Sequence, residues 1–170
     1  MLHETEIKLK YKSRKEIKKL LESLGAKPKE KYLLHDTYFT KNKDISNKNE
    51  LIRIREKGKN YELTFKGKCK AKGNIWKRVE LTSQINNPKT ISKILLLLGF
   101  FKTRENISFR ETYNLNKLEI AFIDFKRPIK LSIIEIEGNE NKIKQLLKKL
   151  GNSVRQIGEE AFKKFDKNPC

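Results

Sequence analysis

Carboxylate side chains that alternate with apolar residues are the groups in this sequence with the clearest chemical potential. Glu4, Glu6 and Lys8 are separated by single residues near the start of the chain. Glu135 and Glu137 repeat that spacing more than a hundred residues later. In a β-strand, alternate positions point to one face, so each segment would place two carboxylates side by side. Carboxylates that share a face repel each other unless a divalent metal or a set of lysines and arginines compensates.

Basic residues alternate in the same way along other strand-like segments. Arg53 and Arg55 flank Ile54, and Arg78 is followed two residues later by Glu80. An open sheet with one solvated face would explain this pattern, and so would a closed barrel with a charged interior. The abundance of arginine favours the barrel, because guanidinium groups bind phosphate in a bidentate manner.

The composition limits the class of protein. With 170 residues, of which 36% are hydrophobic, the chain is expected to form one domain spanning 1–170. The 40 basic residues exceed the 21 acidic ones, and the net charge of +19 predicts an anionic partner. Nucleic acid, an acidic membrane surface and a polyphosphate all fit this charge. Cys69 and Cys170 are too few for a disulfide framework or a zinc cage.

No segment has the length of a membrane span. The longest apolar run, Ile94 to Leu98, has five residues, far fewer than the roughly 20 that a spanning helix needs. Because the charged segment begins already at Glu4, we expect no signal peptide. We therefore expect a cytoplasmic protein with no membrane partner, present as a monomer or a homodimer.

Helix and strand patterns alternate along the chain. Ser13 and Glu16 have capping-box spacing before a helix that ends at Gly25, and further helices are predicted at Pro88–Leu98, Glu140–Leu150 and, more weakly, Glu159–Phe165. Period-two patterns predict strands at Leu51–Arg55, Tyr61–Lys68, Trp76–Leu81, Phe101–Arg104, Ser108–Leu115, Leu118–Asp124 and Leu131–Glu137. The fold class is therefore α+β, dominated by antiparallel strands. Trp76, Tyr38 and Phe39 are interpreted as packing residues.

The motifs, taken in order, resemble those of the CYTH superfamily, the triphosphate tunnel metalloenzymes. Glu4-x-Glu6-x-Lys8 is similar to the ExExK motif of that family. The further matches are His35-Asp36-Thr37-Tyr38-Phe39, Leu51-Ile52-Arg53-Ile54-Arg55, Leu63-Thr64-Phe65-Lys66-Gly67, Arg78-Val79-Glu80, Lys102-Thr103-Arg104, Asp124 and Glu135-Ile136-Glu137. The family includes class IV adenylyl cyclases, thiamine triphosphatases and inorganic triphosphatases.

The resemblance implies an eight-stranded antiparallel β-barrel, or tunnel, with flanking helices. It implies Mg²⁺ or Mn²⁺ as cofactor and a triphosphate-containing small molecule as partner, with Glu4, Glu6 and Lys8 as the catalytic set. The implied metal ligands are Glu4, Glu6, Glu80, Asp124, Glu135 and Glu137. The implied phosphate-binding residues are Lys8, Arg53, Arg55, Lys66, Arg78, Lys102 and Arg104, with either Arg155 or Lys163 as a further basic contact.

Three functions agree with these observations. Hydrolysis of a phosphoanhydride in inorganic triphosphate, a nucleoside triphosphate or thiamine triphosphate is the first. Cyclisation of ATP to cyclic AMP with release of pyrophosphate is the enzymatic alternative. A non-catalytic polyphosphate-binding or nucleic-acid-binding domain is the third, and nucleic acid is disfavoured because acidic residues share the strand faces of the basic ones.

Overall fold

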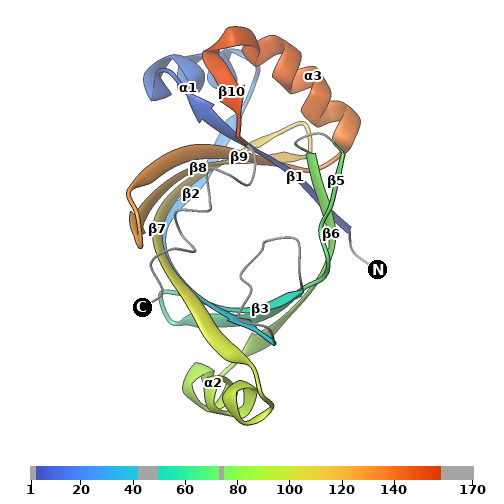
Figure 1. Cartoon of the computed structure of the whole chain (residues 1–170). Coiled ribbons are helices and arrows are strands. Elements are labelled where there is room, and N and C mark those ends of the chain that lie inside the picture. Colours follow the sequence, from blue (N-terminus) through green and yellow to red (C-terminus); the bar gives the residue numbers. More distant parts are fainter. Residues whose placement is uncertain (1–2, 42–49, 73–74, 158–170) are drawn as a thin grey trace.

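The computed structural model describes residues 3–41, 50–72 and 75–157. Its elements follow the order shown in Figure 1. They are β1 (His3–Tyr11), α1 (Arg14–Ser23), β2 (Lys27–Thr40), β3 (Leu51–Lys57), β4 (Asn60–Lys66), β5 (Lys70–Lys72), β6 (Ile75–Ile85), α2 (Pro88–Leu97), β7 (Phe101–Leu115), β8 (Leu118–Arg127), β9 (Leu131–Glu137), α3 (Glu140–Leu150), a 3₁₀ turn (Gly151–Ser153) and β10 (Val154–Gln156).

Eight antiparallel strands close into a barrel, which Figure 1 shows end-on. The hydrogen-bonded order β1-β9-β8-β7-β2-β3-β4-β6 returns to its start because β6 also pairs with β1. The short strands β5 and β10 lie at the margins of this ring, on β6 and β1. The predicted α+β class and the eight-stranded antiparallel barrel are therefore confirmed.

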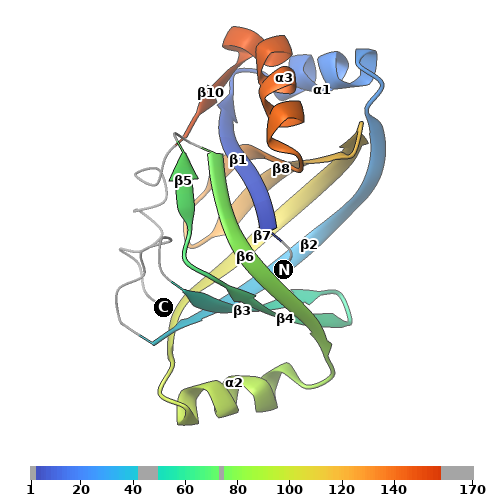
Figure 2. The same cartoon turned by 90° about the vertical axis from the view of Figure 1, so that its right-hand side faces the viewer.

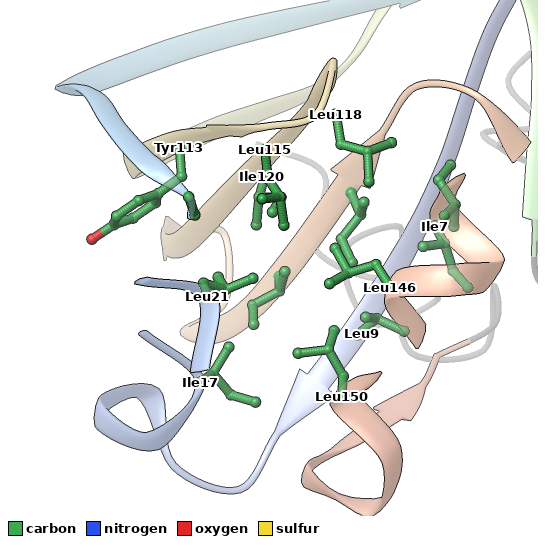
Figure 3. Close-up of a cluster of buried hydrophobic side chains, with 14 of the residues drawn as sticks. Ile7, Leu9, Ile17, Leu21, Tyr113, Leu115, Leu118, Ile120, Leu146 and Leu150 are labelled. Carbon is green, nitrogen blue, oxygen red and sulfur yellow. The ribbon is translucent and has the colours of Figure 1, made fainter. Parts of the chain in front are cut away.

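Helices α1 and α3 cover one outer side of the barrel, and α2 lies at the opposite end of the molecule (Figure 2). The largest apolar cluster lies beneath α1 and α3 (Figure 3). There Ile17 and Leu21 of α1 and Leu146 of α3 pack on Ile7 and Leu9 of β1. The spacing of four residues between Ile17 and Leu21 places both on one face of α1, so burial of that stripe fixes the helix on the barrel.

Polar side chains cap the three helices. The Ser13 hydroxyl accepts a hydrogen bond from the backbone N–H of Glu16 at 3.3 Å, as the capping-box spacing predicts. The side chains of Asn87 and Asn139 cap α2 and α3. Within the described ranges, no helix is both long and apolar enough to cross a membrane. The predicted helix Glu159–Phe165 lies outside the described residues.

Two strands are longer than the sequence predicts. β7 is continuous over Phe101–Leu115, where two shorter strands were expected. Its middle includes Asn106, a polar residue that interrupts the apolar pattern because it faces the barrel interior. β2 spans Lys27–Thr40, whereas the sequence pattern drew attention only to the motif from His35 to Phe39 in this region.

Helix α1 is also fixed by an ionic cluster on the outer face of the barrel. Glu111 of β7 accepts hydrogen bonds from Arg14 and Lys18 of α1, each at 2.9 Å, and from the Tyr113 hydroxyl at 3.0 Å. Burial would raise the pKa of Glu111, but these hydrogen bonds outweigh it and lower the pKa to about 2. The folded protein therefore prefers the ionised carboxylate more than the unfolded chain does.

We expect acid to weaken the fold through Glu111. Because its pKa is lower in the folded state, its stabilisation is complete above pH ~5 and is lost as the pH falls toward 2. Partial solvent screening limits this contribution to roughly 1–2 kcal/mol. Urea unfolding of Glu111→Gln should show a smaller decrease in free energy between pH 5 and 2.5 than the wild type. Glu22→Gln, on the exposed side of α1, is the control. An unchanged pH profile in Glu111→Gln would contradict the assignment.

Candidate active site inside the barrel

A cavity of ≈ 490 Å³ lies within the barrel. Of the thirteen residues that the sequence analysis selected, eleven line it, and they come from β1, β3, β4, β6, β7 and β9. These residues are Glu4, Glu6, Lys8, Arg53, Arg55, Lys66, Arg78, Glu80, Arg104, Glu135 and Glu137. The strand alternation that makes the outer face apolar therefore gathers charged side chains inside.

Strand register brings the carboxylates of β1 and β9 together. Glu6 lies opposite Glu137, and Lys8 lies opposite Glu135. On the other edge of β1, Glu4 lies opposite Arg78 of β6. Side chains directly opposite each other on one face have Cβ atoms only about 5 Å apart. The two separated acidic motifs of the sequence thus form one acidic wall of the cavity.

Two lysines lie among these carboxylates. Lys8 donates a hydrogen bond to Glu6 and forms an ion pair with Glu135 at 3.1 Å. Burial alone would lower the pKa of Lys8, but Glu6 and Glu135 raise it above its usual range. Lys66 forms ion pairs with Glu80 and, at 3.7 Å, with Glu4. Burial and the nearby Arg53 lower the pKa of Lys66.

The acidic wall has more negative charge than the lysines compensate. Burial, followed by the carboxylates of Glu4, Glu135 and Glu6, raises the pKa of Glu137 to about 8. Burial is also the main cause of the raised pKa of Glu4. The buried Oε2 atom of Glu4 accepts no hydrogen bond from the described residues. An added cation at this wall would relieve the repulsion.

The donor set fits a hard divalent cation. Carboxylate oxygens are the ligands that Mg²⁺ and Mn²⁺ prefer. Within the described residues, no three His, Cys, Asp or Glu side chains already form a metal-ligand group. The ammonium groups of Lys8 and Lys66 lie between the carboxylates instead. Metal binding at this wall would therefore require these lysines to move toward other anionic groups.

The basic wall presents guanidinium groups with unused donors. The side chains of Arg53 and Arg78 are 8% and 7% exposed, so they are shielded from bulk water. Arg53 Nε, Arg78 Nη1 and Arg110 Nε make no hydrogen bond with any of the residues that the structure describes. Buried donors are rarely left unsatisfied, and a phosphate oxygen is an acceptor that suits them. This wall therefore has the chemistry of an anion site.

Asp36 on β2 holds one of the arginines in place, a role that the sequence did not reveal. Its carboxylate accepts two hydrogen bonds from Arg55, at Nε and Nη2, both 2.8 Å long. Asp36 is only 3% exposed. Burial would raise its pKa, but Arg55 and then Arg53 lower it well below its usual range. The bidentate contact fixes the guanidinium plane of Arg55 at the cavity wall.

Aromatic rings in the cavity lie against cationic groups. The guanidinium of Arg104 lies 4.5 Å from the ring centre of Tyr38, and Lys8 Nζ lies 4.9 Å from that of Trp76. Tyr38 and Trp76 were expected only to pack, but both line the cavity because they occupy inward strand positions. Trp76 also packs with Ile123 and Ile133, so its interpretation as a core residue is partly confirmed.

Lys102 does not reach the cavity. The register between β2 and β7 shifts beside Thr103, so that Tyr38 lies opposite Arg104 and Phe39 opposite Lys102. This bulge inserts one residue and reverses the inward and outward alternation. Lys102 is consequently exposed and pairs with Glu105. Its assignment to phosphate binding is not supported.

Asp124 also points away from the cavity. It shares a strand face with Phe122, which packs in the outer apolar cluster. Its carboxylate accepts hydrogen bonds from Arg14 of α1 at 2.7 Å and from Ser132 at 2.6 Å. Asp124 therefore anchors α1 on the outer face of the barrel. Its assignment to metal binding was wrong, because the residue occupies an outward strand position.

Of the two basic residues considered near the carboxy terminus, Arg155 lies on β10 opposite Lys10 and is exposed. It does not line the cavity. Lys163 lies outside the described residues. By contrast, Arg110 was overlooked as a site residue, although it shares parity with Arg104 and Asn106 on β7. A continuous strand over this region would have predicted its inward position.

Comparisons with known proteins agree with this geometry. The family model of the CYTH domain matches residues 2–167. No curated protein sequence matches the chain. Among solved structures, a protein from Pyrococcus horikoshii OT3 is 23% identical, with a TM-score of 0.72 over 89% of this chain and 94% of its own.

Two further structures are similar in fold. The Hippeastrum protein HpAC1, described as a candidate adenylyl cyclase with a dominant triphosphatase activity, is 18% identical with a TM-score of 0.71, covering 98% of this chain and 97% of its own. A Bacillus halodurans protein described as a candidate adenylate cyclase is 16% identical with a TM-score of 0.58, covering 93% and 95% of the two chains. At these identities the structural matches establish the fold alone.

Proposed function

Because the chain belongs to the CYTH domain family, whose model matches nearly its whole length, we propose that it is a metal-dependent triphosphatase. It would hydrolyse a phosphoanhydride of inorganic triphosphate, a nucleoside triphosphate or thiamine triphosphate inside the barrel. One observation supports this most strongly. Buried arginine N–H groups that have no acceptor in the described part of the chain face the same cavity as a wall of mutually repelling carboxylates.

The basic wall would bind the phosphate oxygens. Arg53, Arg78 and Arg110 come from three different strands, and each has an N–H group that makes no hydrogen bond within residues 3–41, 50–72 and 75–157. Arg55 is already oriented by Asp36, so little conformational entropy is lost when it binds. Phosphoryl transfer depends mainly on positioning and on charge stabilisation, which a preorganised arginine set provides.

The acidic wall would hold the metal. Glu4, Glu6 and Glu137 are its proposed ligands, with Glu80 and Glu135 close to them. Bound Mg²⁺ or Mn²⁺ would neutralise negative charge on the phosphate oxygens and orient the triphosphate. Lys8 stays protonated, because its carboxylate neighbours raise its pKa. It would therefore keep its positive charge and contact a phosphate oxygen, and it would not act as a general base.

Hydrolysis is favoured over cyclisation by the cationic contacts of the aromatic rings. A nucleobase needs a free aromatic face for stacking, whereas Tyr38 and Trp76 lie against Arg104 and Lys8. Tyr32 is the second tyrosine that lines the cavity, and Lys57 Nζ lies 3.8 Å from the centre of its ring. The cationic contacts at Tyr32, Tyr38 and Trp76 thus favour the phosphate chain over a base at these three rings. The dominant triphosphatase activity described for HpAC1 is consistent with this choice.

We expect inorganic triphosphate to be hydrolysed at least as fast as ATP, with little or no cyclic AMP. Purified protein should be assayed with both substrates and thiamine triphosphate in Mg²⁺ or Mn²⁺, with phosphate, pyrophosphate and cyclic AMP quantified separately. Lys8→Ala serves as the inactive variant, and Lys10→Ala, exposed on the same strand, as its active control. If cyclic AMP were the main product, the protein would be a cyclase and not a hydrolase. Absence of turnover on every triphosphate would favour a binding domain.

A further inference from the structure

Helix α2 exposes large apolar side chains at its carboxy-terminal end. Ile94, Leu96, Leu97 and Leu98 are 44%, 52%, 87% and 65% exposed, and we call these four residues the α2 patch. Figure 2 shows α2 at the end of the molecule opposite α1 and α3. Soluble proteins seldom gather exposed leucines in this way unless the surface binds something.

The other face of α2 already covers the barrel. Leu95 is the residue of α2 that is buried, and it packs with Phe39 and Ile54. The last turn is thus apolar on the side facing the barrel and on the side facing solvent. A helix that is apolar all round is normally buried all round. In α3, by contrast, the exposed positions include Lys144 and Lys148.

The charges next to the α2 patch are positive. Lys89 and Lys93 are exposed on α2, and the helix has no acidic residue. A second copy of the chain would bring these lysines against their own equivalents, between molecules that each have a net charge of +19. An anionic lipid surface complements both the lysines and the leucines, because interfacial helices combine apolar insertion with lysine–headgroup contacts.

We propose that α2 docks the protein on anionic phospholipid bilayers, with Leu97 and Leu98 inserted among the acyl chains and Lys89 and Lys93 at the headgroups. A membrane partner was not expected from the sequence, since the run from Ile94 to Leu98 is too short to span a bilayer. A helix that lies in the interface has no such length requirement. In Figure 1, α2 lies outside the ring of strands, so docking through it would not place lipid inside the barrel.

Vesicle sedimentation tests the proposal on the full chain. Vesicles of 70:30 phosphatidylcholine and phosphatidylserine should bind wild-type protein, whereas pure phosphatidylcholine vesicles should bind it much less. Leu97→Glu should weaken partitioning to the anionic vesicles by about tenfold or more, because it removes a fully inserted leucine. The matched control is Leu33→Glu, a 58% exposed leucine on β2 opposite Phe109, which should bind as wild type.

Other outcomes would overturn the proposal. Equal binding by Leu97→Glu and wild type would mean that only the overall positive charge attracts the vesicles. Equal binding to neutral and anionic vesicles would contradict the role of Lys89 and Lys93. No vesicle binding, together with a dimer in sedimentation velocity that Leu97→Glu dissociates, would assign the α2 patch to self-association. Circular dichroism verifies that each variant is folded. Because Leu97 is exposed, its replacement should leave the fold intact.

Discussion

Replacing Glu4 with glutamine is expected to lower turnover by roughly 10²–10³-fold while leaving the fold intact. Glu4 lies in the acidic wall of the cavity, where its carboxylate is a proposed metal ligand. Burial raises its pKa, so the folded protein tolerates a neutral side chain there better than a charged one. The amide should therefore match or slightly exceed the wild type in stability without metal.

The measurement is kcat in saturating Mg²⁺ or Mn²⁺, together with the melting temperature in the presence of a chelator. Glu56→Gln is the matched control, because Glu56 is exposed on β3 and should not change turnover. Wild-type kcat in Glu4→Gln would remove Glu4 from the metal site. A large loss of stability would show that Glu4 serves the fold instead.

Arg55→Ala should destabilise the folded protein by about 2–4 kcal/mol. The substitution leaves the buried carboxylate of Asp36 without its bidentate partner. A buried charge that loses its partner is costly, although Arg53 and Arg110 still lower the pKa of Asp36 and limit the loss. The free energy of unfolding in urea at pH 7 measures this effect.

Arg53→Ala is the comparison for this pair. Arg53 donates to the hydroxyl of Thr64 at 3.1 Å and, within the described residues, forms no hydrogen bond with a carboxylate, so its removal should change stability by less than about 1 kcal/mol. In the double variant Asp36→Leu with Arg55→Met, most of the lost stability should return, because the unpaired charge is gone. Equal stability of Arg53→Ala and Arg55→Ala would mean that Asp36 does not depend on Arg55.

Much of the barrel could be predicted from the sequence, because strand alternation is a local signal. Glu4, Glu6 and Lys8 share a face in any extended conformation, and so do Arg53 and Arg55. The residues between these charged positions are apolar and need helices to cover them. The apolar face must therefore point outward, and the charged face inward. The capping residues and glycines located α1, α2 and α3 to within two residues of their ends.

What could not be predicted depends on contacts between distant segments. The bulge that turns Lys102 outward exists only in the pairing of β7 with β2. Asp124 lies on the same outward strand face as Phe122. Its role is revealed by its partner Arg14, which is 110 residues away in the sequence. The sequence does not distinguish Asp36 from other strand residues, because its role depends on the pairing that places Arg55 opposite it. Parity fixes which residues share a face, but only the tertiary pairing fixes their partners.

Calorimetric titration with a non-hydrolysable triphosphate analogue in Mg²⁺ tests most directly whether the barrel interior binds triphosphate. Arg53 faces the cavity, and Lys102, which the bulge turns outward, is its matched control. Arg53→Ala should weaken binding by roughly 2–5 kcal/mol, and Lys102→Ala should leave the affinity unchanged. Near-native affinity in Arg53→Ala, or equal losses in both variants, would show that the anion is not held inside the barrel.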